Sequence, residues 1–233
     1  MGRFLSRFWR RPFEGKELIN QMDEVGSRSL LLTGVVGFSI GIVLAMQSRG
    51  TLARFGAESF LPSMLALSVF KEIGPVLTSL VLAGRLGAGM GAELGSMKVT
   101  EQIDALVTLS TNPMKYLVAP RVLAALITVP VLVGVGDIIG IMGGYVVATE
   151  TLDFNAAAYL KNTVDFLELR DIVSSLVKGA AFGTIAALMG CYYGMQSGRG
   201  AQGVGQATKS SVEAAAVLIL AANFVLTGVF FSL

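Results

Sequence analysis

The chain has 233 residues, of which 53% are hydrophobic and only 15% are charged, and its formal net charge is +2. Soluble domains carry about 25% charged residues, so this composition indicates an integral membrane protein, and the small net charge argues against a nucleic-acid partner. There is no histidine and only one cysteine, Cys191, which excludes an intramolecular disulfide and removes the commonest zinc and haem ligands.

The length suits an all-α membrane protein with about five transmembrane helices, since each span takes about 20 residues. Before the first span, over residues 3–22, aromatic side chains interleave with basic ones. This pattern is typical of an amphipathic helix that lies in the membrane interface. We therefore expect an interfacial amphipathic elbow helix over residues 1–28 and a transmembrane domain over residues 29–233. The alternative for the first part is a disordered basic leader.

The first span is expected over residues 29–46. Gly34, Gly37 and Gly41 form a track of small residues there, which would allow another helix to approach closely. Residues 47–59 are more polar and are expected to form a turn outside the membrane.

The second span, over about residues 60–91, carries two adjacent charged residues, Lys71 and Glu72, followed by Gly74 and Pro75. A charge at this depth costs about 2.5–3.5 kcal/mol on insertion scales, so it usually faces a bundle interior or a watery cavity and marks a functional site. Adjacent helical residues point about 100° apart, so we expect Lys71 and Glu72 to find partners on other helices. Pro75 removes a backbone donor and should kink or break the helix. Alternatively, Lys71 extends to a nearby interface and Glu72 has only a packing role.

A polar, amphipathic stretch follows the second span. Its charged residues cannot all lie in hydrocarbon, whereas Met97, Ile103 and Leu106 can share one apolar side of a helix. We expect a short cytoplasmic helix over about residues 95–106, ended by turn-forming residues at 108–113. The alternative is a solvated loop lying on the lipid headgroups.

The remaining segments are predicted by the same reasoning: a third span over 121–147, an external loop with a short surface helix over 150–170, a fourth span over 172–195, a glycine-rich loop over 196–210 and a fifth span over 212–233. Asp137 is the unexpected residue of the third span, and it is expected to pack against a helix or line a cavity. The sequence from Gly134 to Asp137 superficially resembles that of intramembrane aspartyl proteases. That chemistry needs a second carboxylate, for which only Glu72 is available within a span.

The distribution of basic residues near the span ends predicts the orientation. With the N-terminus in the cytoplasm, twelve of these residues lie on the cytoplasmic side, and four lie on the other side: Arg49, Arg54, Lys161 and Arg170. The C-terminus is then periplasmic. The expected helix over residues 95–106 and the loop over 196–210 would face the cytoplasm.

Several ordered motifs resemble those of one known family. The runs FKEIGPVLTSLVLAGRLGAGMGAELGSMKVTEQIDAL and NPMKYLVAPR, the GGY segment at Gly143 and the GVGQAT segment at Gly203 are similar to the permease subunit of Mla/Mce-type ABC lipid transporters, the MlaE family. The similarity extends from about Leu30 to the end of the chain.

The resemblance implies a homodimer of this chain in the inner membrane, joined by a dimer of a cytoplasmic ABC ATPase and by an outer lipid-binding protein of the MCE type. The substrate would be phospholipids or related lipids. ATP and Mg would bind to the ATPase, and this chain would hold no cofactor. A separate ATPase is also the simplest inference from the sequence itself, because the chain contains no GxxxxGK[ST] motif.

Candidate site residues follow from the same resemblance. For lipid binding it suggests acyl-chain contacts and polar groups near the first outer turn, namely Leu44, Leu52 and Phe55, with Gln47, Lys71 and Glu72. For coupling to the ATPase, we expect the 95–106 helix to fit a groove on that protein, with Glu93, Lys98 and Glu101 as polar contacts and Met97 as an apolar anchor. No metal site is expected.

Two other functions remain open. A secondary transporter or channel would use Lys71, Glu72 and Asp137 as an ion relay and would need no ATPase. Internal repeats would favour this reading, and the sequence contains none that is convincing. A structural membrane anchor for a complex is the other possibility.

Overall fold

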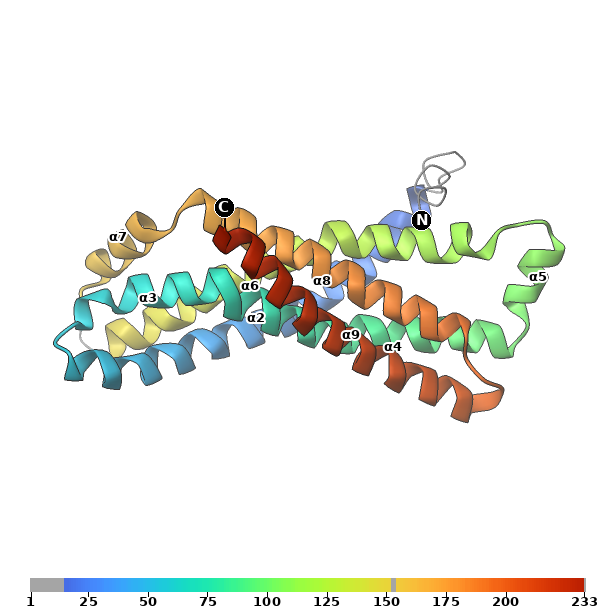
Figure 1. The fold of residues 1–233 in the computed structure, drawn as a ribbon, viewed down its shortest axis with the longest axis horizontal. Helices are drawn as coiled ribbons and strands as arrows, with labels where there is room; N and C mark the ends of the chain where they lie inside the picture. The colour runs from blue at the N-terminus through green and yellow to red at the C-terminus, as the bar shows by residue number, and fades with distance from the viewer. Residues whose placement is uncertain (1–14, 152–153, 233) are drawn as a thin grey trace.

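The structure is a computed structural model that describes residues 15–151 and 154–232, and in these residues the chain is helical with no β-strand (Figure 1). The long helices are α2 (Gly15–Arg54), α4 (Gly74–Val99), α6 (Ala119–Glu150), α8 (Leu169–Met195) and α9 (Gly200–Ser232). Shorter elements connect or extend them: η1 (Glu58–Phe60), α3 (Leu61–Ser68), η2 (Val69–Ile73), α5 (Gln102–Thr108), η3 (Met114–Val118) and α7 (Ala156–Phe166). Five helical segments of the described chain are long and apolar enough to cross a membrane. The predicted all-α membrane architecture is confirmed.

The five spans alternate in direction, so the connections gather at two ends of the bundle (Figure 1). The α5 end holds α5 and the connection between α8 and α9. The α7 end holds α7, the turn between α2 and η1, and the end of α9. Tyr159 fastens α7 to α6: its ring packs edge-on against Tyr145, and its hydroxyl donates to the Ile141 carbonyl oxygen at 3.4 Å. Burial raises the pKa of the Tyr159 phenol, which therefore remains a hydrogen-bond donor at neutral pH.

Three predicted boundaries are wrong. Residues 47–54 continue α2 as helix, so the expected turn over 47–59 is much shorter. The glycine-rich loop expected over 196–210 is helical from Gly200. A Cβ on Gly203 would overlap the Gly198 backbone, so a glycine at this position allows the chain to reverse tightly before the helix. The short helix expected over 95–106 begins only at Gln102.

That last difference has a local cause. Helix α4 continues to Val99, and the chain then turns at Glu101, whose φ of 59° is left-handed and incompatible with a continuous α-helix. The interfacial helix expected over residues 1–28 stays a prediction. Residues 1–14 lie outside the described residues, and residues 15–28 form the start of α2 with no break before the first span.

The distortion expected near Pro75 is present, but as a π-helical turn and not as a break. Helix α3, the π-turn η2 and α4 follow one another without interruption. In the π-turn, the Gly74 N–H donates to the Val69 carbonyl oxygen, five residues back. Single π-turns inside helices are rare and frequently occur at functional sites. This one contains Lys71 and Glu72.

The small residues of α2 pack against small residues of α6, as the glycine track predicts. A Cβ on Gly37 would overlap the Gly136 carbonyl oxygen, and a Cβ on Gly41 would overlap that of Gly140. The two helix backbones are therefore in direct contact, and α2 is held close to the π-turn region through α6.

Gly41→Ala is expected to lower the free energy of unfolding by about 1–3 kcal/mol. The new Cβ would lie 2.7 Å from the Gly140 carbonyl carbon and 2.9 Å from the Gly144 nitrogen, and neither backbone can move away cheaply. Unfolding in mixed micelles measures the loss. Gly34→Ala is the matched control, since its Cβ would meet only the tip of the Ile139 side chain at 3.4 Å. Equal losses for both variants would contradict direct backbone packing.

Candidate functional site

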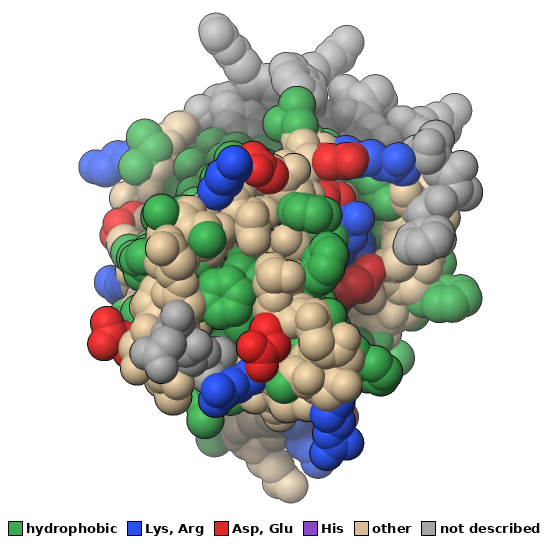
Figure 2. Space-filling model, turned by 90° about the vertical axis from the view of Figure 1, so that its left-hand side faces the viewer, with side chains coloured by type: hydrophobic (Ala, Val, Ile, Leu, Met, Phe, Trp, Pro, Cys, Tyr) green, Lys and Arg blue, Asp and Glu red, His purple; other side chains and the backbone are tan. Residues whose placement is uncertain are grey.

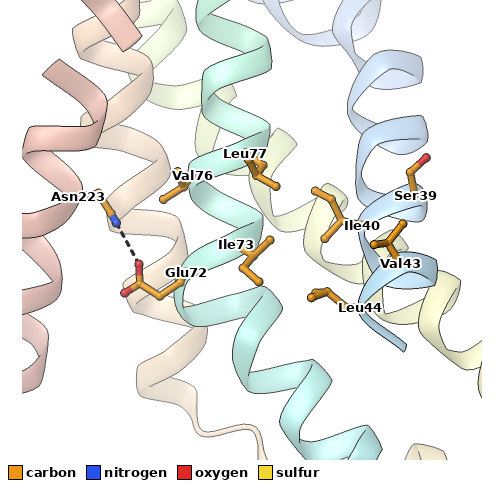
Figure 3. Close-up of a pocket in the computed structure, with 9 residues that line it drawn as sticks. All are labelled: Ser39, Ile40, Val43, Leu44, Glu72, Ile73, Val76, Leu77 and Asn223. Carbon is orange, nitrogen blue, oxygen red and sulfur yellow. Dashed lines mark hydrogen bonds between the residues drawn. The ribbon is translucent and has the colours of Figure 1, made fainter. Parts of the chain in front are cut away.

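A polar cluster of four residues, Glu72, Lys178, Asn223 and Thr227, joins the π-turn to α8 and α9. The Lys178 side chain is 1% exposed, and its Nζ donates to Glu72 Oε1 at 2.8 Å, to Thr227 Oγ1 at 2.8 Å and to the Lys71 carbonyl oxygen at 2.7 Å. Asn223 Nδ2 donates to Glu72 Oε2 at 3.0 Å (Figure 3), and Thr227 Oγ1 donates to Glu72 Oε1 at 2.7 Å. All three ammonium protons of Lys178 are thus matched to oxygen atoms.

The sequence explains why a lysine is needed at this place. In a regular α-helix the Lys71 carbonyl oxygen would accept a hydrogen bond from the N–H of residue 75, which is a proline and has none. Lys178 supplies the missing donor and also neutralises Glu72. Pro75 and Lys178 therefore act together, although they lie on different helices.

Lys71 points to a different partner. Its Nζ lies 3.2 Å from Asp171 Oδ1, and Asp171 is buried in the first turn of α8, where it forms a capping box with Glu168. The expectation that Lys71 and Glu72 pair with residues of other helices is confirmed. Helix α8 presents three polar residues on one side, and each meets a different residue of the neighbouring helices: Asp171 meets Lys71, Ser175 meets Asp137 and Lys178 meets Glu72.

Three cavities meet at Glu72. The first, of about 580 Å³, lies between α2 and α4 and is lined by apolar side chains such as Val43 and Leu44, with Glu72 and Asn223 at its edge (Figure 3). The second, of about 650 Å³, follows α9 past Leu220 and Phe224. Cavities of this size are typical of small-molecule sites.

The third cavity, of about 300 Å³, is lined mainly by charged groups: Lys71, Glu72, Glu168, Arg170, Asp171 and Lys178. Arg170 and Glu168 lie at the start of α8, so this cavity approaches the α7 end of the bundle. The α7 end as a whole carries both acidic and basic side chains around apolar ones (Figure 2). One polar cavity and two apolar cavities thus share Glu72 as their common wall.

The residues predicted for lipid contact are only partly brought together. Leu44 and Glu72 line the same apolar cavity, and Lys71 lines the polar one. Leu52 borders a separate small cavity nearer the end of α2. Gln47 is exposed, and Phe55 is 79% exposed.

Sequence reasoning missed the groups that complete the cluster, namely Lys178, Asn223, Thr227 and Asp171. Lys178 carried a usable signal, since a lysine inside an apolar span is costly for the same reason as Lys71 and Glu72. Asn223 and Thr227 carried little, because neutral polar residues are common in membrane helices.

The α5 end has a different character. Ile103 is buried at 3% exposure, and Leu106 and Met97 pack against the same core, so α5 is held firmly to the bundle. Val107 and Leu109 are left 56% and 75% exposed. We call the exposed residues of this region, together with the half-buried Lys98, the α5 surface: Lys98, Glu101, Asp104, Val107 and Leu109. Lys98 and Asp104 form a long ion pair of 3.7 Å within it.

Glu93, predicted as a contact for an ATPase, has an internal partner. Its Oε1 lies 2.7 Å from the guanidinium of Arg121, which is 3% exposed and also donates to the Leu117 carbonyl oxygen at 2.7 Å. Glu93 belongs to α4 and Arg121 to α6, so this ion pair joins the two helices at the base of α5. The ion pair thereby holds together the segments of chain that precede and follow α5.

The chain is similar to known permease proteins. A family model described as Permease MlaE matches residues 18–229. A probable ABC transporter permease protein of Rickettsia felis is 49% identical over 227 residues, which cover 97% of this chain and 88% of the relative. A probable ABC transporter permease protein of Synechocystis is 36% identical, covering 93% of this chain and 82% of the relative. The intermembrane phospholipid transport system permease protein MlaE of Haemophilus influenzae is 34% identical, covering 92% and 82%.

Proposed function

The chain belongs to the MlaE permease family, and we propose that it is the membrane subunit of a transporter that moves phospholipids with energy from a separate ATPase. As a permease it is a transport component and not a catalytic enzyme. The proposed substrate is the one named for the Haemophilus influenzae relative. The proposed location is the inner membrane.

The observation that carries the proposal is the meeting of three cavities at Glu72. A phospholipid has a charged headgroup and two apolar chains, so it needs a polar compartment next to apolar ones. The charged cavity suits the phosphate-bearing headgroup, because the Lys71 side chain lines it and is 51% exposed, and ammonium groups bind phosphate as point charges. The cavities along α2 and α9 suit the acyl chains.

A second copy of the chain would complete this site. In the apolar 18-residue stretches of α2 and α9 only 28% and 11% of the residues are buried within one chain, compared with 50% in the span that contains the π-turn. The cavity lined by Val43 and Leu44 opens on this little-covered side. A twofold dimer, the commonest closed assembly, would enclose it and bring two such cavities together.

The α5 end is proposed to face the cytoplasm, with the N-terminus, and the C-terminus is proposed to be periplasmic, as the basic residues predict. The α5 surface is then placed to meet an ABC ATPase dimer, which would bind ATP and Mg. Val107 and Leu109 are the apolar contacts that we propose, with Lys98 and Glu101 as polar contacts. Met97, which packs against the core, and Glu93, which pairs with Arg121, would support α5. An MCE-type lipid-binding protein would approach the α7 end.

Purification of the tagged chain in mild detergent tests the proposal. Co-purifying proteins are identified, and bound lipid is extracted and analysed by mass. We expect an ATPase in equal amount and bound phospholipid. A chain that carries neither, also in lipid nanodiscs, would contradict the proposal and would favour ion-driven transport through Lys71, Glu72 and Asp137.

A further inference from the structure

Asp137 is a fully buried acidic residue that the proposed lipid site does not use. It lies on α6 with 0% of its surface exposed. Its Oδ2 accepts a hydrogen bond from Ser175 Oγ at 2.5 Å. Its other oxygen, Oδ1, is buried and has no hydrogen-bond partner among the described residues. The Asp137 carboxyl group therefore receives one hydrogen bond, at Oδ2, and none from the described residues at Oδ1.

The charged groups of the π-turn, and the lysine of α8 that follows Ser175, are engaged elsewhere. On the π-turn, Lys71 pairs with Asp171 and Glu72 pairs with Lys178. On α8, Lys178 has all three protons committed to Glu72, Thr227 and the Lys71 carbonyl oxygen. Among the described residues, Asp137 is thus left without a cationic partner. An ionised carboxylate in such surroundings is very costly, and buried groups of this kind take up a proton instead.

The unpaired Oδ1 is pressed against the π-turn. It occupies the space in which a Cβ of residue 74 would lie, and only a glycine leaves that space free. A Cβ at residue 74 would also lie 2.6 Å from the Val69 carbonyl oxygen. The next carbonyl, that of Phe70, lacks its α-helical donor, because the Gly74 N–H donates to Val69, and the following residue, Pro75, has no N–H to replace it. The unpaired oxygen of Asp137 therefore lies next to the Val69 carbonyl oxygen, which is also a hydrogen-bond acceptor.

We propose that Asp137 holds a proton, and that the neutral acid donates a hydrogen bond from Oδ1 to a backbone carbonyl of the π-turn. With Ser175 bound to Oδ2, the acid then links α8, α6 and the π-turn at one point. By fixing the π-turn, Asp137 positions the adjacent side chains of Lys71 and Glu72, which point to different partners. The ligand at this site is a single proton. Its loss would remove the hydrogen bond to the π-turn and leave a charged Oδ1 repelled by the neighbouring carbonyl oxygen.

The bound proton can be tested without any transport assay. Infrared spectra of the purified chain in nanodiscs at neutral pH should contain the carbonyl stretching band of a protonated carboxylic acid, and Asp137→Asn should remove it. The positioning role rests on the proposed function and is tested by lipid binding. An Asn amide can donate to the π-turn and accept from Ser175, so Asp137→Asn should bind phospholipid within about twofold of the wild type. Asp137→Ala should lose more than about tenfold.

The outcomes separate the two proposals. A wild-type chain with no protonated-acid band, or an Asn variant that loses as much lipid as the Ala variant, would overturn the assignment of Asp137. The band in the wild type, together with no phospholipid in any variant, would support the proton site and contradict the lipid function. The infrared comparison needs only the wild type and the Asn variant, so it stands even where the Ala variant folds poorly.

Discussion

Glu72→Gln is expected to lower the free energy of unfolding by about 3 kcal/mol. It leaves the Lys178 ammonium, which is 1% exposed, without a negative partner inside the bundle. The figure is taken at the low end of the range for breaking a buried ion pair, because the Glu72 side chain is 40% exposed. Lys178→Met should cost less, since Glu72 keeps Thr227 and Asn223 as donors. Unfolding in mixed micelles measures both values.

The double variant Glu72→Gln, Lys178→Met decides whether the pair acts as a unit. It should be more stable than the sum of the two single losses predicts, by at least about 1 kcal/mol. Lys209→Met is the control, because Lys209 forms an exposed ion pair of 3.8 Å with Glu213, and this type of pair contributes little. Additive losses would show that Glu72 and Lys178 are not coupled. All three cluster variants should also lose bound phospholipid.

Val107→Asp and Leu109→Asp should each weaken binding of the ATPase by more than about thirtyfold, as expected for an apolar anchor at the centre of an interface. Both side chains are exposed in the single chain, so the substitutions should leave its stability unchanged. Co-purification of the ATPase, followed by titration of its affinity, measures the effect.

Leu160→Asp is the matched control for this experiment. Leu160 is 53% exposed on α7, at the opposite end of the bundle, and its substitution should leave ATPase binding unchanged. Normal ATPase binding by both α5 variants would contradict the proposed docking surface. Loss with the α7 variant as well would point to a general defect of the membrane domain.

The spans were predictable because hydrophobicity summed over about 20 residues is a strong signal. Their ends were not, because the glycines near Gly200 resemble a loop in sequence, whereas Gly203 serves close backbone packing. Lys71 and Glu72 were found by the cost of burying a charge, and that argument also applies to Lys178.

The predicted lipid contacts show a different limit. Whether Leu44 and Leu52 line one cavity depends on how far α2 continues as a helix and on which side it packs against α6. Local composition predicts neither the length of α2 nor the side of it that packs against α6. The same is true of Asp137, which stands out in the sequence, while its contact with the π-turn arises only from the packing of α6 against Gly74.

Transport is measured directly as ATP-dependent movement of a labelled phospholipid in vesicles that contain the chain together with its co-purified ATPase. The wild type should move lipid only when ATP is present. The Glu72→Gln, Lys178→Met variant should retain the ATPase but move little lipid. Movement that follows an ion gradient without ATP, or wild-type rates in that variant, would contradict a role for this polar cluster in ATP-driven phospholipid transport.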